Sequence, residues 1–474
     1  MKKHFFALAL IGLLVACGST PDATPAPAPA PETPTQTTTA DPVPEQVAEA
    51  DVPERDLNGM IIYIGHWWDN FDTATAGVPE NAVAEALLHA RIAAQERYNF
   101  TVRERFVAPH NELQGVVANS IVTGDPVAHV VVLEDFMWGA LANQGLFAPL
   151  HGVDFGDTSK VHWNQSVRNA TMRNGVPHGF NYVTATGGGI YFNPLLLEEA
   201  GIDPELPFDM LMAGEWTWAN FMDLLRQLNI DRDNNGVIDV HAISALPEWT
   251  LNLAVMSNDA PYVVADPVTG ELINNTNTPE FFQAVQFVAD FMNEGLIMPT
   301  PDGSPDWDWP IWAFQLGQSA MTVGFDWMSW QLQAMDHPIG FVPFPKGPNA
   351  DTHLFPGSPT NIFSIPMTYA DMVDDIMFAM SHWHALPEEF NDGLAWVPAA
   401  MSQFTHPRSV TDSLIHFNRN PELHRLPMHL FVPGLEMGPL LAWGFFDYEL
   451  DVTAMIEGFQ LQMNSFLADY NNAN

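Results

Sequence analysis

The order of apolar and polar positions in the first part of the chain predicts alternating strands and helices. Short continuous apolar runs are typical of buried strands, whereas apolar positions three and four residues apart form one face of a helix. These patterns predict strands at 60–65, 101–107 and 127–133 and helices at 82–97 and 111–122. Strand, helix, strand, helix, strand is the order of an α/β fold with a mainly parallel sheet.

Two polar and aromatic segments follow strands of this expected sheet. His66-Trp67-Trp68-Asp69 comes after the first strand, and Glu134-Asp135 comes after the third. Because sites in such sheets lie beyond the carboxyl ends of the strands, both segments are candidates for a binding site. The alternative is that each Trp packs in the core and that each carboxylate only caps a helix or forms a turn.

The rest of the chain is predicted to add helices and short strands. Gly187-Gly188-Gly189 and the apolar residues after it indicate a turn followed by a strand. Helices are expected at 216–228, 280–294, 373–385 and 452–467, and the sequence contains no internal repeat. A length of 474 residues with 47% hydrophobic residues fits two or three globular domains.

Charge and cysteine content exclude several classes of function. The chain has 16 Lys and Arg against 57 Asp and Glu, for a formal net charge of −41. Such a surface repels phosphate backbones and anionic lipid headgroups, so we expect no nucleic-acid partner. Cys17 is the single cysteine, which excludes an internal disulfide.

The N-terminal residues predict export and lipid attachment. Lys2 and Lys3 precede an apolar run at 5–16, which is too short to span a bilayer and is typical of a signal peptide. The sequence LVACG at 14–18 resembles the lipobox of bacterial lipoproteins, which implies that 1–17 is a signal peptide and that Cys17 is lipidated. The alternative is an ordinary signal peptide with an incidental cysteine. No later segment is apolar enough to cross a membrane.

Residues 18–56 are predicted to be a disordered linker. Pro, Thr, Ala and Glu dominate this segment and aromatic residues are missing, so it cannot bury enough apolar surface to fold. Repeated Ala-Pro pairs favour an extended, semi-rigid conformation. We therefore expect a stalk that holds a folded domain away from the membrane.

Four segments together resemble the extracellular solute-binding lipoproteins of ABC importers, the family that includes maltose-binding protein. They are GIYFNPLLLEEAG at 189–201, EWTWANF at 215–221, FQLGQSAM at 314–321 and FVPFPKGP at 341–348. Each segment alone is weakly specific, but the four occur in the order of the family. The resemblance covers about 57–474 and is looser over the last hundred residues.

The resemblance implies an α/β, two-lobed periplasmic-binding-protein-like fold of type II, with lobes joined by crossing hinge strands. It implies a first lobe of 57–178 and 322–370 and a second lobe of 179–321 and 371–474. The crossings are expected near 176–182, 320–326 and 365–380. Ligand would bind between the lobes, and hinge closure would deliver it to an ABC permease. The expected protein is a monomer, anchored by lipid on the outer face of the cell membrane, with no catalytic residue.

The tryptophans favour a carbohydrate ligand. Indole rings stack on the C–H faces of a sugar, and carboxylates accept its hydroxyl hydrogen bonds. The chain has 15 Trp, of which we expect Trp216 and Trp218 to pack in the core. The predicted ligand-binding residues are Trp67, Trp68, Asp69, Glu134, Asp135, Trp249, Asp326, Trp327 and Trp443.

A short acidic loop predicts a structural calcium site. Asp231, Asp233, Asn235 and Asp239 stand at positions 1, 3, 5 and 9, with Val237 at 7, as in an EF-type loop. Position 12 is Ala242, so a remote carboxylate would have to replace the usual Glu. A metal-free turn rich in Asp and Asn is the alternative.

Three other functions remain open on the sequence alone. The chain could bind a peptide or polyol in place of a sugar, act as a secreted glycosidase, or serve as a surface adhesion module. A glycosidase needs a pair of carboxylates, for which Glu134 with Asp135 or Asp306 with Asp308 are candidates. Transition-metal binding is disfavoured, because His382 and His384 diverge on a helix and no cysteine accompanies them.

Overall fold

The computed structural model describes most of the chain after the linker. The described residues are 55–68, 79, 81–155, 161, 163–182, 187–266, 269–301, 307–357, 360–435 and 451–473. Cys17, residues 18–54 of the predicted linker, Asp69 and Trp443 lie outside them. The last two residues assigned to the linker, Arg55 and Asp56, instead contact the folded domain through Asp375 and Asn99. Among the described residues, no helix has the length and apolar character needed to cross a membrane.

The first lobe is built on a four-stranded sheet with the order β13-β3-β1-β2. Its strands are β1 (Met60–His66), β2 (Phe100–Phe106), β3 (Val130–Glu134) and β13 (Asn361–Ser364). The strand β1 runs parallel to β2 and β3, whereas β13 is antiparallel to β3. The helices are α1 (Ala82–Tyr98), α2 (His110–Val122), α3 (Asp135–Ala142), α4 (Gln165–Ala170) and α12 (Val373–Trp383). The predicted order of strands and helices is therefore confirmed.

Local chemistry fixes the ends of the first helix. The side chain of Asn81 accepts a hydrogen bond from the backbone N–H of Ala84 at 2.9 Å, which satisfies one of the free donors at the helix start. Asn99 ends the helix with a φ of 50°, in the left-handed region that Asn tolerates. The chain then turns directly into β2.

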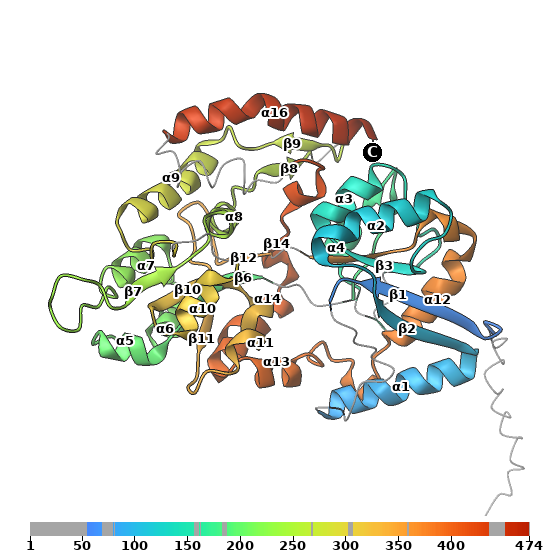
Figure 1. Ribbon diagram of the computed structural model, residues 1–474, viewed down its shortest axis with the longest axis horizontal. Coiled ribbons are helices and arrows are strands. Elements are labelled where there is room, and N and C mark those ends of the chain that lie inside the picture. The colour runs from blue at the N-terminus through green and yellow to red at the C-terminus, as the bar shows by residue number, and fades with distance from the viewer. Residues whose placement is uncertain are drawn as a thin grey trace, which may run out of the picture. The chain divides into compact units, whose positions relative to one another are not determined.

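The second lobe has its own four-stranded sheet, with the order β11-β6-β10-β7. Its strands are β6 (Gly188–Phe192), β7 (His241–Ser244), β10 (Ser319–Phe325) and β11 (Gly340–Pro343). The helices include α5 (Pro194–Glu199), α6 (Leu206–Ala213), α7 (Trp218–Leu225), α8 (Pro247–Ser257), α9 (Pro279–Asn293), α10 (Trp309–Gln315), α13 (Val397–Gln403) and α14 (Ile415–Arg419). Figure 1 shows these elements gathered around β6, β7, β10 and β11.

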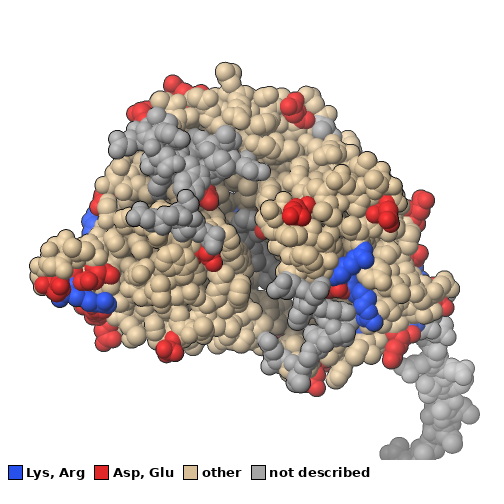
Figure 2. All heavy atoms as spheres, viewed as in Figure 1, with Lys and Arg blue, Asp and Glu red and all other residues tan. Residues whose placement is uncertain are grey.

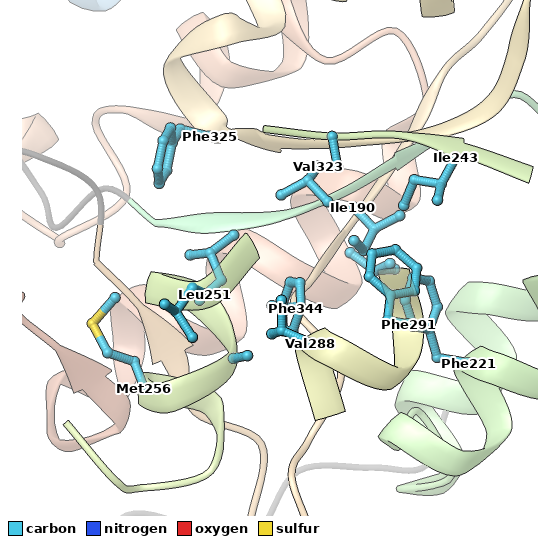
Figure 3. Close-up of a cluster of buried hydrophobic side chains, with 14 of the residues drawn as sticks. Ile190, Phe221, Ile243, Leu251, Met256, Val288, Phe291, Val323, Phe325 and Phe344 are labelled. Atoms are coloured by element: carbon cyan, nitrogen blue, oxygen red, sulfur yellow. The ribbon is translucent and has the colours of Figure 1, made fainter. Parts of the chain in front are cut away.

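A large hydrophobic core lies between the second sheet and its helices. Ile190 and Val323 come from neighbouring strands, and Phe221, Leu251 and Phe291 come from helices that cover the sheet (Figure 3). All five are almost completely buried. Burying such side chains stabilises the fold by about 1.5–3 kcal/mol each, so this core holds the second lobe together.

Paired residues mark two of the places where the described chain passes between the lobes. Phe180 pairs with Phe363 beside the first sheet, and Gly187 pairs with Gly357 beside the second. The chain therefore crosses between lobes after 180 and again after 357. Glycine is required at 187, because a Cβ there would lie 2.5 Å from the ring of Phe355.

The expected lobe boundaries need correction in the middle and later parts of the chain. The strand β10 does not cross at 320–326, because it pairs with β6 and β7 within the second sheet, and β11 also pairs with β6. Residues 322–357 thus belong to the second lobe. Conversely, α12 packs through Ile376 and Met380 into the first core, so the third crossing lies after α12. Short-range patterns cannot show these long-range pairings.

The C-terminal helix α16 (Val452–Ala473) contacts both lobes. Asn471 bonds the backbone of Leu272 in the second lobe twice, at 3.0 and 2.9 Å. Tyr470 accepts a hydrogen bond of 3.1 Å from Arg173, which belongs to the first lobe. This helix therefore supplies a further connection between the lobes.

Several basic side chains of the described surface are paired with acids. Arg226 bonds Glu294 at 2.7 Å, Arg232 bonds Glu199 at 2.7 Å, and Arg425 bonds Asp259 at 2.8 Å. On the face drawn in Figure 2, acidic side chains are scattered and the few basic ones lie near acids. This face therefore offers no basic patch to a polyanion.

Candidate functional site

Aromatic rings gather at the carboxyl end of β1. Trp67 and Trp68, both half-buried, follow the strand and meet edge to face, with ring centroids 5.0 Å apart. The buried ring of His66 stacks on Trp68 at 4.1 Å and nearly parallel, which fixes the plane of that indole. The strand end thus presents two preformed indole surfaces.

His110 connects these rings to the predicted carboxylate Glu134. Its ring meets Trp67 edge to face at 5.4 Å, and its Nε2 lies 3.1 Å from Oε2 of Glu134. The hydrogen bond with Glu134 raises the pKa of His110. Sequence reasoning missed His110, although it is the fourth residue after the end of β2 and the same strand-end rule applies to it. The structure brings Trp67, Trp68 and Glu134 together in one group.

Asp135 has a different role from the one expected. It is fully buried, and its two carboxylate oxygens accept hydrogen bonds from the backbone N–H of Phe136 at 2.9 Å and of Thr360 at 3.1 Å. Its own N–H donates to the carbonyl of Thr360 at 3.1 Å. Burial raises the pKa of Asp135 well above its usual range. Asp135 anchors the start of β13, whereas Glu134 is the more accessible of the two carboxylates, with 24% of its side chain exposed.

The second group lies beyond the carboxyl end of β10. Trp327 is 37% exposed, and its ring lies 6.2 Å from Phe325 and 6.0 Å from Trp307. Trp249 reaches the same place from α8, with its ring 6.0 Å from Trp307 and 5.2 Å from Phe325. The structure therefore joins the predicted residues Trp249 and Trp327 through Trp307, which was not predicted.

Asp326 lies beside the first crossing. Its N–H donates to the carbonyl of Gly187 at 2.9 Å, and its Oδ1 accepts from the N–H of Trp327 at 2.9 Å. Tyr191 donates its hydroxyl to the carbonyls of Phe325 at 2.8 Å and of Asp326 at 3.2 Å. Burial raises the pKa of Asp326 to about 7.

The free energy of unfolding of the Asp326→Asn variant, relative to that of the parent, should increase as the pH rises. The pKa of Asp326 is raised from an ordinary 3.8 to about 7 in the folded chain. Such a group contributes stability that is present below its unfolded pKa and is lost as the pH rises through its folded pKa. We expect Asp326→Asn to gain unfolding free energy relative to the parent between about pH 4 and pH 8, measured by urea denaturation. A constant difference would contradict the raised pKa.

The two groups flank the same crossing segment. Asp326 is bonded to Gly187, and Gly187 pairs with Gly357. Only three residues later, Thr360 is bonded to Asp135, next to Glu134. Three residues of chain span at most roughly 11 Å. The ends of β3 and β10 that carry the candidate residues are therefore attached to the two ends of one short segment.

Two other tryptophans pack in the core, as predicted. Trp216 is completely buried and donates its indole N–H to the carbonyl of Pro343 at 2.8 Å. Trp218 is 6% exposed and donates to the hydroxyl of Ser257 at 3.3 Å. Asp69 and Trp443 lie outside the described residues, so their predicted roles remain predictions.

The acidic loop of the second lobe brings its carboxylates together. Oxygen atoms of Asp231, Asp233 and Asp239 lie within 4.8 Å of one another. The side chain of Asp231 also accepts from the N–H of Gly236 at 2.8 Å, a bond that lowers its pKa. Ala242 is completely buried and has no side-chain oxygen. Within the described chain, no fourth carboxylate joins these three. The geometry of the loop is compatible with a bound hard cation and also with a metal-free turn.

Comparisons with known proteins place the chain among solute-binding proteins. The family described as bacterial extracellular solute-binding protein matches residues 77–370. No curated protein sequence matches the chain.

Solved structures are similar to the chain along most of its length. The cyclic alpha-maltosyl-1,6-maltose binding protein from Arthrobacter globiformis has a TM-score of 0.58 at 15% identity, covering 86% of this chain and 99% of that one. The sugar-binding protein MalE from Xanthomonas citri has a TM-score of 0.57 at 14% identity, covering 86% and 98%. UgpB from Mycobacterium tuberculosis, solved with glycerophosphocholine, has a TM-score of 0.56 at 16% identity, covering 86% and 98%. At these identities the likeness shows a shared two-lobed fold.

Proposed function

This chain belongs to the bacterial extracellular solute-binding protein family, and we propose that it captures a carbohydrate between its lobes as the substrate-binding component of an ABC importer. The observation that supports a sugar is the pairing of partly exposed indoles with carboxylates on both sides of one crossing. Trp67, Trp68 and Glu134 lie on one side, and Asp326 and Trp327 lie on the other. Indoles stack on sugar faces, and carboxylates accept sugar hydroxyls.

The charge of the site argues against an anionic solute. Neither group includes a Lys or an Arg, and Glu134 adds a carboxylate. Asp326, with a pKa of about 7, adds a further negative charge that is only partial at neutral pH. A phosphate or carboxylate ligand would meet like charge and few donors there. A neutral, hydroxyl-rich molecule such as a sugar fits this chemistry better. A neutral polyol would present the hydroxyls but no ring face to the indoles.

The family binds solutes and carries out no chemical step, so the chain is not an enzyme. The arrangement of its carboxylates agrees with this conclusion. Both oxygens of Asp135 are occupied by backbone donors, so Asp135 cannot form an acid–base pair with Glu134. The second pair considered from the sequence includes Asp306, which lies outside the described residues.

A ligand panel tests the proposed function directly. Thermal unfolding of the purified folded domain should be followed with mono- and oligosaccharides, polyols, short peptides and glycerophosphocholine. A ligand that binds only the folded state raises its stability by mass action. We expect a rise in melting temperature with at least one sugar and none with peptides. A shift with peptides or glycerophosphocholine alone would refute carbohydrate binding.

We also propose that the protein is a monomer anchored by lipid at Cys17. The family acts outside the cytoplasm, and the lipobox-like sequence at 14–18 supports an anchor. Replacing Cys17 with Ala should move the protein from the membrane fraction to the soluble fraction, because the thiol that would carry the lipid is lost. Fractionation of cells followed by immunoblotting measures this change. An unchanged membrane fraction would contradict the anchor.

Calcium binding by the acidic loop is a further part of the proposal. Asp231, Asp233, Asn235 and Asp239 would supply side-chain oxygens and Val237 a carbonyl, with water completing six to eight ligands. At a hundredfold excess over its Kd, calcium would add about 2.7 kcal/mol. We expect a chelator to lower the melting temperature and calcium to restore it. The variant Asp231→Asn with Asp239→Asn should lose the response. An equal melting temperature with and without the chelator would favour the metal-free turn.

A further inference from the structure

We infer that the site takes an oligosaccharide, and that Trp307 contacts a second sugar unit beyond the one at Trp327. This inference rests on the proposed carbohydrate function and concerns the length of the ligand. It starts from the three indoles of the second lobe, Trp249, Trp307 and Trp327. Trp307 is in ring contact with both of the others, at 6.0 Å each.

The exposure of these rings increases away from the core. Trp249 is half-buried against Phe325, Trp327 is 37% exposed, and Trp307 is 53% exposed. A single exposed indole is ordinary, but adjoining exposed rings form an apolar surface that usually marks a contact site. This surface continues directly from Asp326 and Trp327, the second-lobe part of the proposed site.

The planes of the three indole rings are tilted relative to one another, and this limits which ligands can stack on more than one of them. Trp307 makes angles of 59° with Trp249 and 51° with Trp327. One flat sugar ring can stack on one of these faces, but not on two faces at such angles. Two linked sugar rings can turn about their glycosidic bond and cover one face each. A monosaccharide would leave the Trp307 face in water.

Trp330 provides a matched control. It is 60% exposed and lies three residues after Trp327, but within the described residues no ring contact links it to the three indoles. Trp330→Ala therefore removes an exposed indole from the same region without touching the proposed platform. Trp307→Ala should be equally well tolerated by the fold, because more than half of its side chain is already in water.

The test is calorimetric titration of the folded domain and both variants with mono-, di- and trisaccharides. The probes are glucose and its α-1,4-, α-1,6- and β-1,4-linked oligomers, with melting temperatures as a check of folding. We expect at least one series to bind more tightly as a disaccharide or trisaccharide than as glucose. Trp307→Ala should weaken binding of the longer sugars about tenfold, because one stacked ring contributes up to about 1.5 kcal/mol. Its affinity for glucose should be unchanged. Trp330→Ala should bind every probe like the parent.

The outcomes separate the inference from the proposed function. If a sugar binds but affinity does not rise with length, or if Trp307→Ala binds all lengths like the parent, the oligosaccharide inference is wrong and the carbohydrate function stands. If Trp330→Ala lowers oligosaccharide affinity as much as Trp307→Ala does, the effect is not specific to the surface formed by Trp249, Trp307 and Trp327. The inference is then also wrong. If no sugar of any length binds the parent, the proposed carbohydrate function itself is overturned.

Discussion

Trp327→Ala is expected to weaken carbohydrate binding by roughly thirty- to a thousandfold while the protein stays folded. Truncating a central aromatic contact costs on the order of 2–4 kcal/mol in affinity. Trp327 is 37% exposed, so its removal should change the free energy of unfolding little. The affinity is measured by calorimetric titration with the sugar that gives the largest melting shift, and stability is measured by urea denaturation.

The matched control for this prediction is Trp216→Ala. Trp216 is completely buried and its indole N–H is bonded to Pro343, so truncation should destabilise the fold by about 3–5 kcal/mol. Trp67→Ala and Trp68→Ala belong to the same series, and at least one of them should lose affinity and remain folded. If all three site variants bind like the parent, or all three unfold like Trp216→Ala, the sugar site lies elsewhere.

The first lobe could be predicted well from the sequence because its signals are local. Continuous apolar runs mark β1 and β3, and Asn81 marks the start of α1. The lobe boundaries could not be predicted, because they depend on pairings between distant residues. β11 joins β6 across about 150 residues of chain, and no local pattern records that partnership.

The rule that binding sites lie beyond the carboxyl ends of strands identified part of the candidate site. It identified Trp67 and Glu134 on the first sheet, and the family resemblance identified Trp327 on the second. The same rule would have found His110 had it been applied to β2. Trp307 could not be found this way, because it lies just before α10 and reaches the site only through packing against Trp249 and Trp327.

Asp135 shows why residue type alone does not define a ligand contact. Its neighbour Glu134 has the same chemistry, but β3 alternates its side chains and the helix α3 begins at Asp135. One carboxylate is therefore directed to His110 near the surface, and the other is buried against Thr360. Only the three-dimensional position separates the ligand candidate from the structural residue.

Asp135→Ala is expected to lower the free energy of unfolding by about 2–6 kcal/mol, since two buried donors lose their partner and each costs about 1–3 kcal/mol. The substitution would remove the acceptors of the Phe136 and Thr360 N–H groups. Because Thr360 immediately precedes β13, at the end of the crossing, affinity for sugar should fall as well. Asp135→Asn should have a smaller effect, because its amide oxygen can replace one acceptor of the two.

Glu134→Gln is the control that separates the two neighbours. Glu134 is half-buried and its carboxylate bonds the exposed His110, so the loss of its charge should change stability by less than about 1 kcal/mol. Affinity should nevertheless fall if Glu134 accepts a sugar hydroxyl. Urea denaturation and calorimetric titration of the three variants give both quantities. A stable Asp135→Ala protein would show that the crossing does not depend on this carboxylate, and the link between the two halves of the site would then need another anchor.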